Sequence, residues 1–409
     1  MQAALAPSIW ELDDVKKGVL LMLFGGVNKK LTNKSLRGEI NVLLCGDPGT
    51  SKSQLLSYVH KIAPRGLYTS GKGTSAVGLT AYVYKDPETK ELTLESGALV
   101  LSDRGVCCID EFDKMSDSAR SILHEAMEQQ TVSVAKAGII ATLNARTSVL
   151  ASANPIESRY NPKLSIVENI NLSPTLLSRF DLIYLILDKP NPVTDRRLAK
   201  HLVALFYKEG ATRSAAVDPK LLADYISFAR LHIQPKITDE AALALVEGYV
   251  DMRMVGNSSN HARNKKMITA TPRQLEAIIR LSEAHARLHY RNQVLREDVL
   301  EATRLMNVAT QKAATDPTTG TIDMDMITTG QTATGRQLIA ALVQELKTML
   351  GNAFKGKSAS FIELQRAMES DTVTVNPDDL EEALRQLSDT GLVTWNESAR
   401  LWRIAEVFA

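Results

Sequence analysis

Short runs of consecutive apolar residues lie between turn residues or amphipathic stretches over the first half of the chain. They are Ile40–Cys45, Ala98–Ser102, Val106–Ile109, Thr147–Ala151 and Leu182–Leu187. Strands that are apolar along their whole length are covered on both faces, which is typical of parallel sheets flanked by helices. The pattern therefore predicts an α/β fold in which these runs are central strands.

A helix is predicted ahead of the first of these strands. Ser8 is followed three residues later by Glu11, and this pair can cap a helix start reciprocally. Apolar residues then recur at helical spacing, and Gly25-Gly26 ends the pattern. We expect a helix that begins near Ser8 and ends at about Phe24.

The second half of the chain has mainly helical periodicity. Helices are predicted at Asp195–Lys208, Pro219–Leu231, Asp239–Met254, Pro272–Tyr290 and Arg296–Lys312. The next stretch is rich in Thr, Gly and Asp, which predicts a linker over 314–335. We therefore divide the first 313 residues into an α/β core over 1–210 and a helical domain over 211–313.

The segment 336–409 has a pattern of its own. Three helical stretches precede two β-like runs, and the five elements are Gln337–Leu350, Phe361–Glu369, Asp378–Ser388, Leu392–Trp395 and Leu401–Ile404. Three helices closed by a hairpin predict a small winged-helix domain.

Composition narrows the class of protein. With 409 residues, 44% apolar and 23% charged, the chain is globular and can bury a large core. No apolar run approaches the ~18 residues that cross a bilayer, and Met1 is not followed by a secretory signal, so we expect a soluble chain with no membrane contact. The cysteines Cys45, Cys107 and Cys108 lie in predicted strands and suggest neither a disulfide framework nor a zinc site.

The net charge of +1 does not indicate a nucleic-acid binder, but the charges are unevenly distributed. Residues 252–304 contain 10 basic and 5 acidic residues, whereas 332–409 contain 8 basic and 11 acidic ones. Because phosphate contacts need Lys and Arg, we expect any strong contact with nucleic acid to come from the first 330 residues.

A phosphate-binding loop is predicted where the strand ending at Cys45 meets an apolar helix. The segment reads Gly46, Asp47, Pro48, Gly49, Thr50, Ser51, Lys52, Ser53 and Gln54. Such a loop turns backbone N–H groups and a helix N-terminus toward phosphate, while Lys52 reaches the β- and γ-phosphates and Ser53 ligates Mg²⁺. Ser51 stands where the last Gly of the motif is expected. The alternative is a Gly/Pro turn before a helix with a surface lysine.

An acidic pair follows another predicted strand. Asp110 and Glu111 come directly after Val106–Ile109. At the carboxyl end of a parallel strand beside a phosphate loop, Asp110 would hold Mg²⁺ and Glu111 would activate the attacking water. By itself, Asp-Glu after an apolar run is equally typical of a strand that leaves the core.

Together with these motifs, further stretches resemble the AAA+ ATPase module of the minichromosome maintenance (MCM) replicative helicases. They are Gly78-Leu-Thr-Ala81, Cys108-Ile-Asp-Glu-Phe-Asp-Lys-Met115, Ala153-Asn-Pro155 and Leu177-Ser-Arg-Phe-Asp181. The resemblance covers the chain from about Ser8 to the end. It implies that 1–210 is an AAA+ core with pore-loop insertions, that 211–313 is its α-helical lid, and that ATP and Mg²⁺ are the cofactors. The OB-fold region that precedes this module in the family has no counterpart here, as expected of a fragment.

The resemblance also implies roles for single residues. Asn154 resembles the sensor of the γ-phosphate, and Arg179 resembles the arginine finger that completes the ATP site of a neighbouring subunit. Arg273 resembles the second sensor, and with Glu276 it would contact nucleotide bound to that neighbour. Trp10 matches a position close to the nucleotide. Without the resemblance, these residues would be interpreted as an Asn-Pro turn, solvated charges and a core or surface aromatic.

The start of the helix that carries Arg273 can be interpreted without the family. Thr271 is a good N-cap, Pro272 suits the first helical position, and Gln274 can close a capping box. Arg273 begins a charged stripe at helical spacing that continues with Glu276, Arg280, Glu283 and Arg287. For the last three we expect a solvated face with ion pairs along the helix.

Two insertions resemble the pore loops that meet DNA in this family. Thr131–Ala141 alternates polar and apolar residues around a turn with Gly138, which predicts a hairpin with Lys136 near its tip. The segment 78–95 carries Lys85 beside an Asp86-Pro87 turn and resembles the second loop. A hairpin lysine can also serve solubility and edge protection.

The function implied by the resemblance is an ATP hydrolase and DNA helicase subunit of a hexameric MCM ring, acting in replication initiation and elongation. The implied partners are other MCM paralogues, DNA in the central channel and fork-associated helicase activators such as GINS, and the implied location is the nucleus. Two alternatives stay open. One is an AAA+ remodelling ATPase that grips a protein substrate, and the other is a largely structural ring subunit.

Overall fold

The computed structural model describes residues 4–30, 35–85, 92–136, 139–156, 160–161, 169–170, 172–188, 192–207, 217–255 and 271–313, and short pieces between 342 and 404. The chain forms two compact units, Met1–Gly330 and Gln331–Ala409. In the described residues, no helix has the length and apolar character that a membrane span requires.

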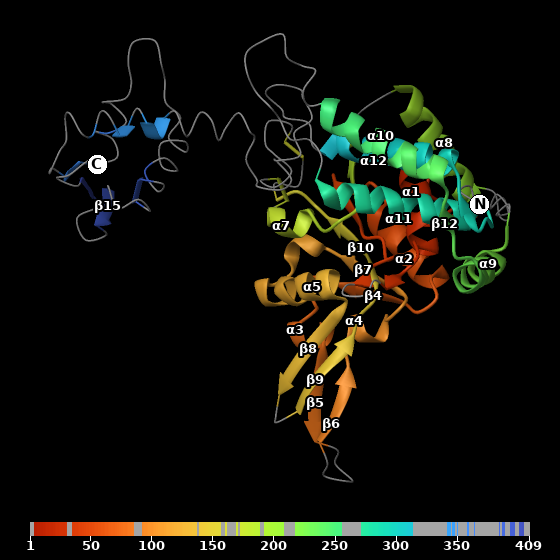
Figure 1. Cartoon of the computed structure of the whole chain (residues 1–409), viewed down its shortest axis with the longest axis horizontal. Coiled ribbons are helices and arrows are strands. Elements are labelled where there is room, and N and C mark those ends of the chain that lie inside the picture. Colours follow the sequence, from red (N-terminus) through yellow and green to blue (C-terminus); the bar gives the residue numbers. More distant parts are fainter. Residues whose placement is uncertain are drawn as a thin grey trace. The chain divides into compact units, whose positions relative to one another are not determined.

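The first unit is built on a five-stranded sheet with the strand order β11-β3-β10-β7-β4 (Figure 1). Its strands are β3 (Val42–Gly46), β4 (Gly66–Ser70), β7 (Val106–Asp110), β10 (Ser148–Ala153) and β11 (Leu182–Ile186). Every neighbouring pair is parallel, which confirms the predicted α/β fold.

Successive residues of a strand point to opposite faces, and both faces of this sheet are covered. Val42 and Leu44 pack into one buried cluster, whereas Leu43 and Cys45 pack into another. This is why the runs are apolar without alternation. Burial raises the pKa of the Cys45 thiol to about 12, so the side chain is a neutral thiol at physiological pH.

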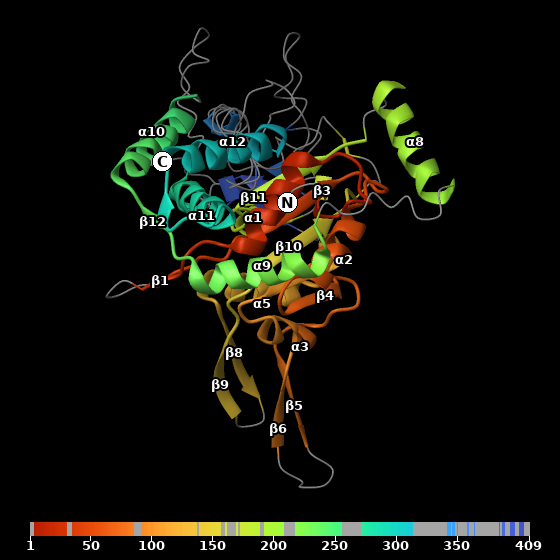
Figure 2. The same cartoon turned by 90° about the vertical axis from the view of Figure 1, so that its right-hand side faces the viewer.

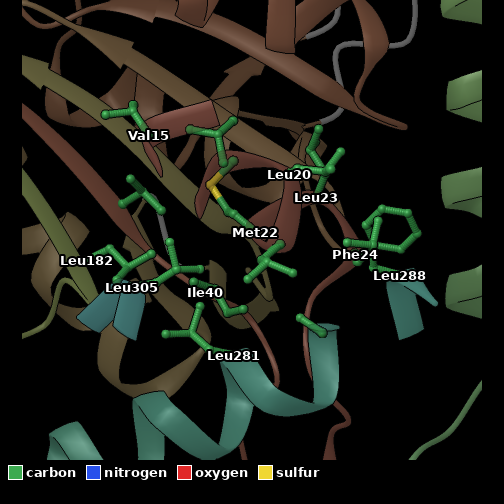
Figure 3. Close-up of a cluster of buried hydrophobic side chains, with 14 of the residues drawn as sticks. Val15, Leu20, Met22, Leu23, Phe24, Ile40, Leu182, Leu281, Leu288 and Leu305 are labelled. Atoms are coloured by element: carbon green, nitrogen blue, oxygen red, sulfur yellow. The ribbon is translucent and has the colours of Figure 1, made fainter. Parts of the chain in front are cut away.

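The first cluster joins the sheet to helices that come from both ends of the unit. They are α1 (Asp13–Phe24), α2 (Lys52–Ile62), α9 (Pro219–His232), α10 (Asp239–Val255), α11 (Pro272–Leu288) and α12 (Arg296–Ala313). Figure 3 shows side chains of α1 packed with Leu281 and Leu288 of α11, Leu305 of α12 and Leu182 of β11. The helices of the predicted lid therefore share one core with the sheet.

Helix α5 (Asp117–Gln129) and three helices of four residues cover the second face. The three short helices are α3 (Ala76–Leu79), α4 (Ala98–Leu101) and α7 (Pro174–Leu177), and the 3₁₀ turn η2 (Phe112–Lys114) adds Phe112. The unit also contains α8 (Pro192–Tyr207) and the short strands β1 (Lys29–Lys30), β2 (Ser35–Leu36), β12 (Lys236–Ile237) and β13 (Gln293–Val294). The five helices predicted for the second half of this unit are confirmed.

Two antiparallel hairpins project from the same side of the sheet in both views (Figures 1 and 2). One pairs β5 (Ala81–Lys85) with β6 (Leu92–Ser96), and the other pairs β8 (Thr131–Lys136) with β9 (Ile139–Asn144). The hairpin predicted over Thr131–Ala141 is thus confirmed, and the segment 78–95 also forms a hairpin. The lid helices α10, α11 and α12 gather at the opposite end.

Two local predictions are wrong. Ala98–Ser102 is not a strand, because its residues form helix α4, and a short apolar run does not distinguish a strand from a buried helical turn. The fifth strand is instead β4, an edge strand whose residues are half-buried except for the exposed Tyr68, and whose sequence gives no continuous apolar signal. Helix α1 begins at Asp13, after Leu12 in a left-handed conformation, so Ser8 does not cap it.

The charged stripe on α11 was also predicted wrongly. Arg280, Glu283 and Arg287 are 5%, 1% and 5% exposed, so they are not a solvated face. Arg287 donates to the carbonyl oxygens of Phe24 and Gly25 at 2.7 Å, and thereby caps the carboxyl end of α1. Residues far away in the chain cover this face, and the helical period alone does not reveal them.

The second unit contains a three-stranded antiparallel sheet with the order β14-β16-β15. Its strands are β14 (Ser358–Ala359), β15 (Val393–Asn396) and β16 (Leu401–Ile404). The predicted pair of final strands is confirmed, and Trp395 lies opposite Trp402. The linker over 314–335 and most of the three predicted helices lie outside the described residues, so the winged-helix domain stays a prediction.

Candidate nucleotide site

The predicted phosphate loop connects the buried strand β3 to helix α2. Gly46 (φ 140°) and Gly49 (φ 84°) have positive φ, which glycine adopts freely. Ser51 has φ 61°, the left-handed conformation, and this explains why the motif has Gly at that position. The loop needs this conformation to direct backbone N–H groups to one point ahead of α2.

Lys52 is the first residue of α2 and is 5% exposed. Its Nζ donates to the carbonyl oxygens of Gly46 at 2.9 Å and Asp47 at 2.6 Å, and to Thr50 Oγ1 at 3.1 Å. Burial lowers the pKa of Lys52, although the carboxylates of Asp47, Asp110 and Asp113 act against this. The ammonium group is therefore held inside the loop, where an anion would relieve the cost of its burial.

Asp47 anchors the loop to two other segments. Its Oδ1 accepts from the backbone N–H of Tyr160 at 2.8 Å, and its Oδ2 accepts from that of Asp188 at 3.0 Å. These residues follow β10 and β11 in the chain. The side chain of Asp47 is thus committed to the shape of the site, which the motif pattern did not indicate.

Asp110 ends β7 and is 9% exposed. Its Oδ1 accepts from the Ser152 hydroxyl, and its Oδ2 accepts from Tyr68 Oη at 2.8 Å. Burial raises the pKa of Asp110, but hydrogen bonds from Ser152, Tyr68 and Ser53 outweigh burial and lower it overall. A carboxylate that is charged at neutral pH therefore lies beside the first turn of α2.

Tyr68 and Ser152 were missed by the sequence analysis. Tyr68 lies on β4, which was not predicted as a strand, and Ser152 lies on β10 beside the predicted sensor. Burial and, to a smaller extent, the hydrogen bond to Asp110 raise the pKa of Tyr68 to about 12. Only the pairing of β4 and β10 with β7 brings both hydroxyls to one carboxylate.

The strand order also brings Asn154 and Glu111 to the carboxyl ends of the strands, where the phosphate loop lies. Strand β10 lies between β3 and β7, so Asn154 comes after Ala153, which is paired with Cys45 at the start of the loop. The backbone N–H of Asn154 donates to Asp113 Oδ1 at 3.1 Å. Glu111 is half-buried, has φ 51°, and accepts from Ser70 Oγ at 3.5 Å. Lys52, Asp110, Glu111 and Asn154 thus follow the carboxyl ends of three adjacent parallel strands.

Arg179 and Arg273 lie elsewhere. Arg179 follows α7 and precedes the amino end of β11, which is parallel to β3. The phosphate loop follows the carboxyl end of β3, so a strand of five residues, about 16 Å, separates the two levels of the sheet. Arg179 therefore lies at the end of the sheet opposite to the phosphate loop of its own chain.

Glu128 of α5 brings the two arginines together. Arg179 Nη2 forms an ion pair with Glu128, and Arg273 Nη2 lies 3.8 Å from Glu128 Oε1. Arg273 Nη1 also donates to Ser178 Oγ at 2.9 Å. The ion pair with Arg179 is the main cause that lowers the pKa of Glu128. No catalytic or binding motif pointed to Glu128. Its role depends on the packing of α5 against residues 178–181 between α7 and β11, which we call the Arg179 loop.

The capping prediction for α11 is confirmed. Thr271 is the N-cap, Pro272 is the first helical residue, and Gln274 closes a capping box in which its Oε1 accepts from the backbone N–H of Thr271 at 3.1 Å. Glu276 is exposed, and its Oε2 lies 3.5 Å from Arg280 Nη1. Trp10 is half-buried, three residues before α1. The predicted nucleotide contacts of Glu276, Trp10 and Gln54 stay predictions.

Lys85 and Lys136 are the last residues of β5 and β8, at the ends of the two hairpins. Their side chains, and the turns over 86–91 and 137–138, lie outside the described residues. Ile140, which pairs with Ala135 next to Lys136, is 88% exposed. The predicted DNA contacts of these lysines stay predictions.

A parallel sheet, a phosphate loop after β3 and an acidic pair at the end of β7, with β10 between these two strands, define the P-loop class of nucleotide-binding proteins, here with an AAA+ lid. Family models agree, since the MCM P-loop domain matches residues 1–206 and the MCM AAA-lid domain matches residues 220–310. The chain belongs to the MCM family.

Comparison with relatives from plants and yeast shows which MCM paralogues resemble the chain. The chain is 61% identical over 400 residues to "DNA replication licensing factor MCM4" of Oryza sativa subsp. japonica, covering 95% of this chain and 46% of the relative. It is 57% identical over 412 residues to the protein of that name from Arabidopsis thaliana, covering 99% and 48%. With mcm7 of Schizosaccharomyces pombe the identity is 50% over 309 residues, covering 75% and 40%.

The chain thus spans about half the length of the curated relatives that it matches. Three stretches, Leu43–Cys45, His124–Gln130 and Thr315–Gly320, predict that it is most similar to subunit four among the eukaryotic paralogues. The higher identity and longer coverage with proteins named MCM4 confirm this prediction.

Proposed function

We propose that this chain is the motor part of an ATP-dependent DNA helicase subunit that works in a heterohexameric ring of MCM paralogues. The observation that carries the proposal is the separation of two half-sites on one sheet. Lys52, Asp110 and Asn154 lie where the parallel strands have their carboxyl ends, whereas Arg179 lies where the strands have their amino ends. An ATP site that needs both halves is completed only between two chains.

The residues present fit ATP and Mg²⁺. The Ser53 hydroxyl is one of the groups that lower the pKa of Asp110, which keeps this carboxylate charged, and hydroxyl, carboxylate and phosphate oxygens are the ligands that Mg²⁺ prefers. Lys52 and the N-terminus of α2 present positive charge to the same point. Bound Mg²⁺ would neutralise charge on the β- and γ-phosphates during phosphoryl transfer.

The chain's own residues then have separate tasks. Lys52 binds the β- and γ-phosphates, and Asp110 together with Ser53 holds the metal. Glu111 accepts a proton from the attacking water, and Asn154 orients that water. In the neighbouring site, Arg179 and Arg273 stabilise the charge on the transferring phosphoryl group.

DNA would be contacted by the two hairpins. They extend in the same direction from the sheet, so six copies around a ring would surround a channel. Lys136 and Lys85, at the hairpin ends, supply positive charge that binds a phosphate backbone with little sequence preference. Movement of the lid and of the Arg179 loop after hydrolysis would shift the hairpins along the DNA.

The partners in this proposal are other MCM paralogues, DNA and fork-associated helicase activators such as GINS, and the place of action is the nucleus. Relatives named as the DNA replication licensing factors MCM4 and mcm7 support the MCM paralogues as partners. The acidic segment 332–409 is proposed as a docking or regulatory domain rather than a DNA reader.

Strand separation by the assembled ring tests the proposal. Full-length hexamers that carry Lys52→Ala in this subunit should unwind a forked duplex more slowly than wild-type hexamers. Lys61→Ala changes an exposed lysine in the last turn of the same helix and is the matched control. Wild-type rings that hydrolyse ATP but never separate strands, and instead unfold a tagged protein substrate, would favour the remodelling ATPase.

A further inference from the structure

A buried ionic cluster joins the Arg179 loop to the lid helix α11. Asp181, two residues after Arg179, has a side chain that is only 4% exposed, and Arg280 of α11 has one that is 6% exposed. Arg280 Nη2 lies 2.5 Å from Asp181 Oδ1, and Arg37 Nη2 lies 3.2 Å from the same oxygen. The backbone N–H of Asn41 donates to Asp181 Oδ2 at 2.9 Å. We call these four residues the Asp181 clamp.

The clamp also holds the neighbourhood of both arginines that are assigned to the adjacent site. Arg37 Nη2 and Asn41 Nδ2 donate to the carbonyl oxygen of Arg179 at 3.3 and 3.4 Å. Arg37 Nη1 donates to the carbonyl oxygen of Met127 at 2.9 Å. Met127 precedes Glu128, the residue that Arg179 and Arg273 share. The clamp therefore holds the backbone at Arg179 and next to Glu128, two of the three residues that form the cluster of Arg179, Arg273 and Glu128.

Helix geometry links the clamp to Arg273. Arg280 follows Arg273 by seven residues, which is about two turns, so both side chains leave α11 on similar faces. One end of this face contacts Ser178 and Glu128 through Arg273, and the other contacts Asp181 through Arg280. The lid is thus tied to the Arg179 loop at two points.

The buried ion pairs of the clamp are expected to add little to the free energy of unfolding, because removing their charges from water is costly. Ions that leave water lose several kcal/mol of hydration, and apolar residues of similar volume often fill such a site equally well. What a buried ion pair provides is a defined geometry, because a carboxylate accepts hydrogen bonds in few directions. Burial raises the pKa of Asp181, but Arg280 and Arg37 lower it overall, so the carboxylate stays charged.

We propose that Asp181 and Arg280 are positioning residues that hold Arg179 and Arg273 in one fixed arrangement for the neighbouring subunit's ATP site. This inference rests on the proposed function. Neither residue touches the nucleotide, and both act through the two arginines. A displacement of about 1 Å can cost a reaction a factor of about a hundred, so loss of the clamp should slow turnover in the neighbour.

The test compares two sites that this chain helps to form. In complexes with one neighbour, the chain provides the phosphate loop, and in complexes with the other it provides the arginines. Arg280→Met should lower kcat at the neighbour's site by about tenfold or more and leave kcat at the chain's own phosphate loop within about twofold. Arg280→Lys keeps the charge and should recover much of the lost turnover.

Arg287→Met is the matched control. Arg287 lies on the same helix with the same 5% exposure as Arg280, but it donates to backbone carbonyl oxygens at the end of α1. If Arg280→Met or Arg287→Met caused only a general loss of folding, kcat should fall equally at the chain's own phosphate loop and at the neighbour's site. Asp181→Asn keeps the side-chain shape and provides a second test if Arg280→Met does not fold, with the same defect expected at the neighbour's site.

The outcomes separate this inference from the proposed function. If Arg179→Ala slows the neighbour's site but Arg280→Met and Asp181→Asn leave it unchanged or impair both sites equally, the positioning role is wrong. If Arg179→Ala itself leaves the neighbour's turnover intact, the proposed shared site is wrong. A selective defect of the neighbour's site in the clamp variants, partly recovered by Arg280→Lys, supports both.

Discussion

Arg179 and Arg273 contact the same carboxylate, Glu128, although they come from different domains of the predicted fold. Arg179 is nearly buried, whereas Arg273 and Glu128 are about half exposed. Glu128 neutralises the charge of two arginines that we propose to contact the nucleotide of the neighbouring chain. When a phosphate group of the neighbour approaches, both arginines can exchange Glu128 for the more highly charged anion.

This arrangement predicts an asymmetric effect of Arg179→Ala. The variant should bind nucleotide at its own phosphate loop as well as the wild-type chain, and should slow ATP hydrolysis at the neighbour's site by about a thousandfold. Nucleotide binding by fluorescence and turnover in paired complexes would measure the two effects. Loss of binding at the chain's own loop, with normal turnover in the neighbour, would mean that the assignment is reversed.

The same arrangement predicts that this chain hydrolyses ATP slowly on its own. A monomer, verified by sedimentation, has the phosphate loop but receives no arginine from a neighbour. Its turnover should rise when the neighbouring paralogue is added. Rapid hydrolysis by the isolated monomer would contradict a site shared between chains.

Glu111→Gln should separate binding from hydrolysis. The amide preserves the shape and position of the side chain but cannot accept a proton from water. We expect unchanged ATP affinity and a loss of turnover of about a hundredfold or more at this site. Equilibrium binding and single-turnover hydrolysis would be measured on the same preparation, and unchanged turnover would exclude Glu111 as the base.

Gly46 and Gly49 should respond differently to replacement by alanine. A Cβ at Gly46 would lie 1.9 Å from the carbonyl oxygen of Ile186, so Gly46→Ala should cost about 3 kcal/mol of unfolding free energy or more. A Cβ at Gly49 meets nothing within 4 Å, and only its positive φ opposes the change, at a cost of about 1 kcal/mol. Denaturant unfolding of the two variants would measure the difference, and equal costs would contradict this geometry.

Ser152→Ala should make the chain less stable in a manner that depends on pH. The hydroxyl is buried and donates to a charged carboxylate, so its removal should cost about 2 kcal/mol near neutral pH. The folded-state pKa of Asp110 lies below its usual value of 3.8, so this stabilisation is present above that value and is lost as the pH falls through the lowered pKa. The difference from wild type should therefore shrink toward pH 3.

Tyr68→Phe is the control for Ser152→Ala because it removes another donor to the same carboxylate. Tyr68 is 39% exposed, so water can replace its hydroxyl. We expect a loss of less than about 1 kcal/mol. Urea unfolding between pH 7 and pH 3 would compare both variants. A loss for Ser152→Ala that stays constant over this range would contradict the coupling to Asp110.

Much of the nucleotide site could be predicted from the sequence because its signals are local. The phosphate loop needs contiguous residues between a strand and a helix, and Asp110-Glu111 directly follows its strand. The cap of α11 at Thr271 is equally local. Such features depend on backbone geometry over a few residues, which residue type largely determines.

Other features arise only when distant segments meet. Glu128 and Tyr68 gain their roles through pairing and packing, and Ala98–Ser102 became a helix although its apolar run resembles a strand. The stripe of Arg280, Glu283 and Arg287 has a helical period that a solvated face would also have. Periodicity records which side chains share a face, but the partners that cover the face are fixed by tertiary packing, and only these partners make burial of a charge tolerable.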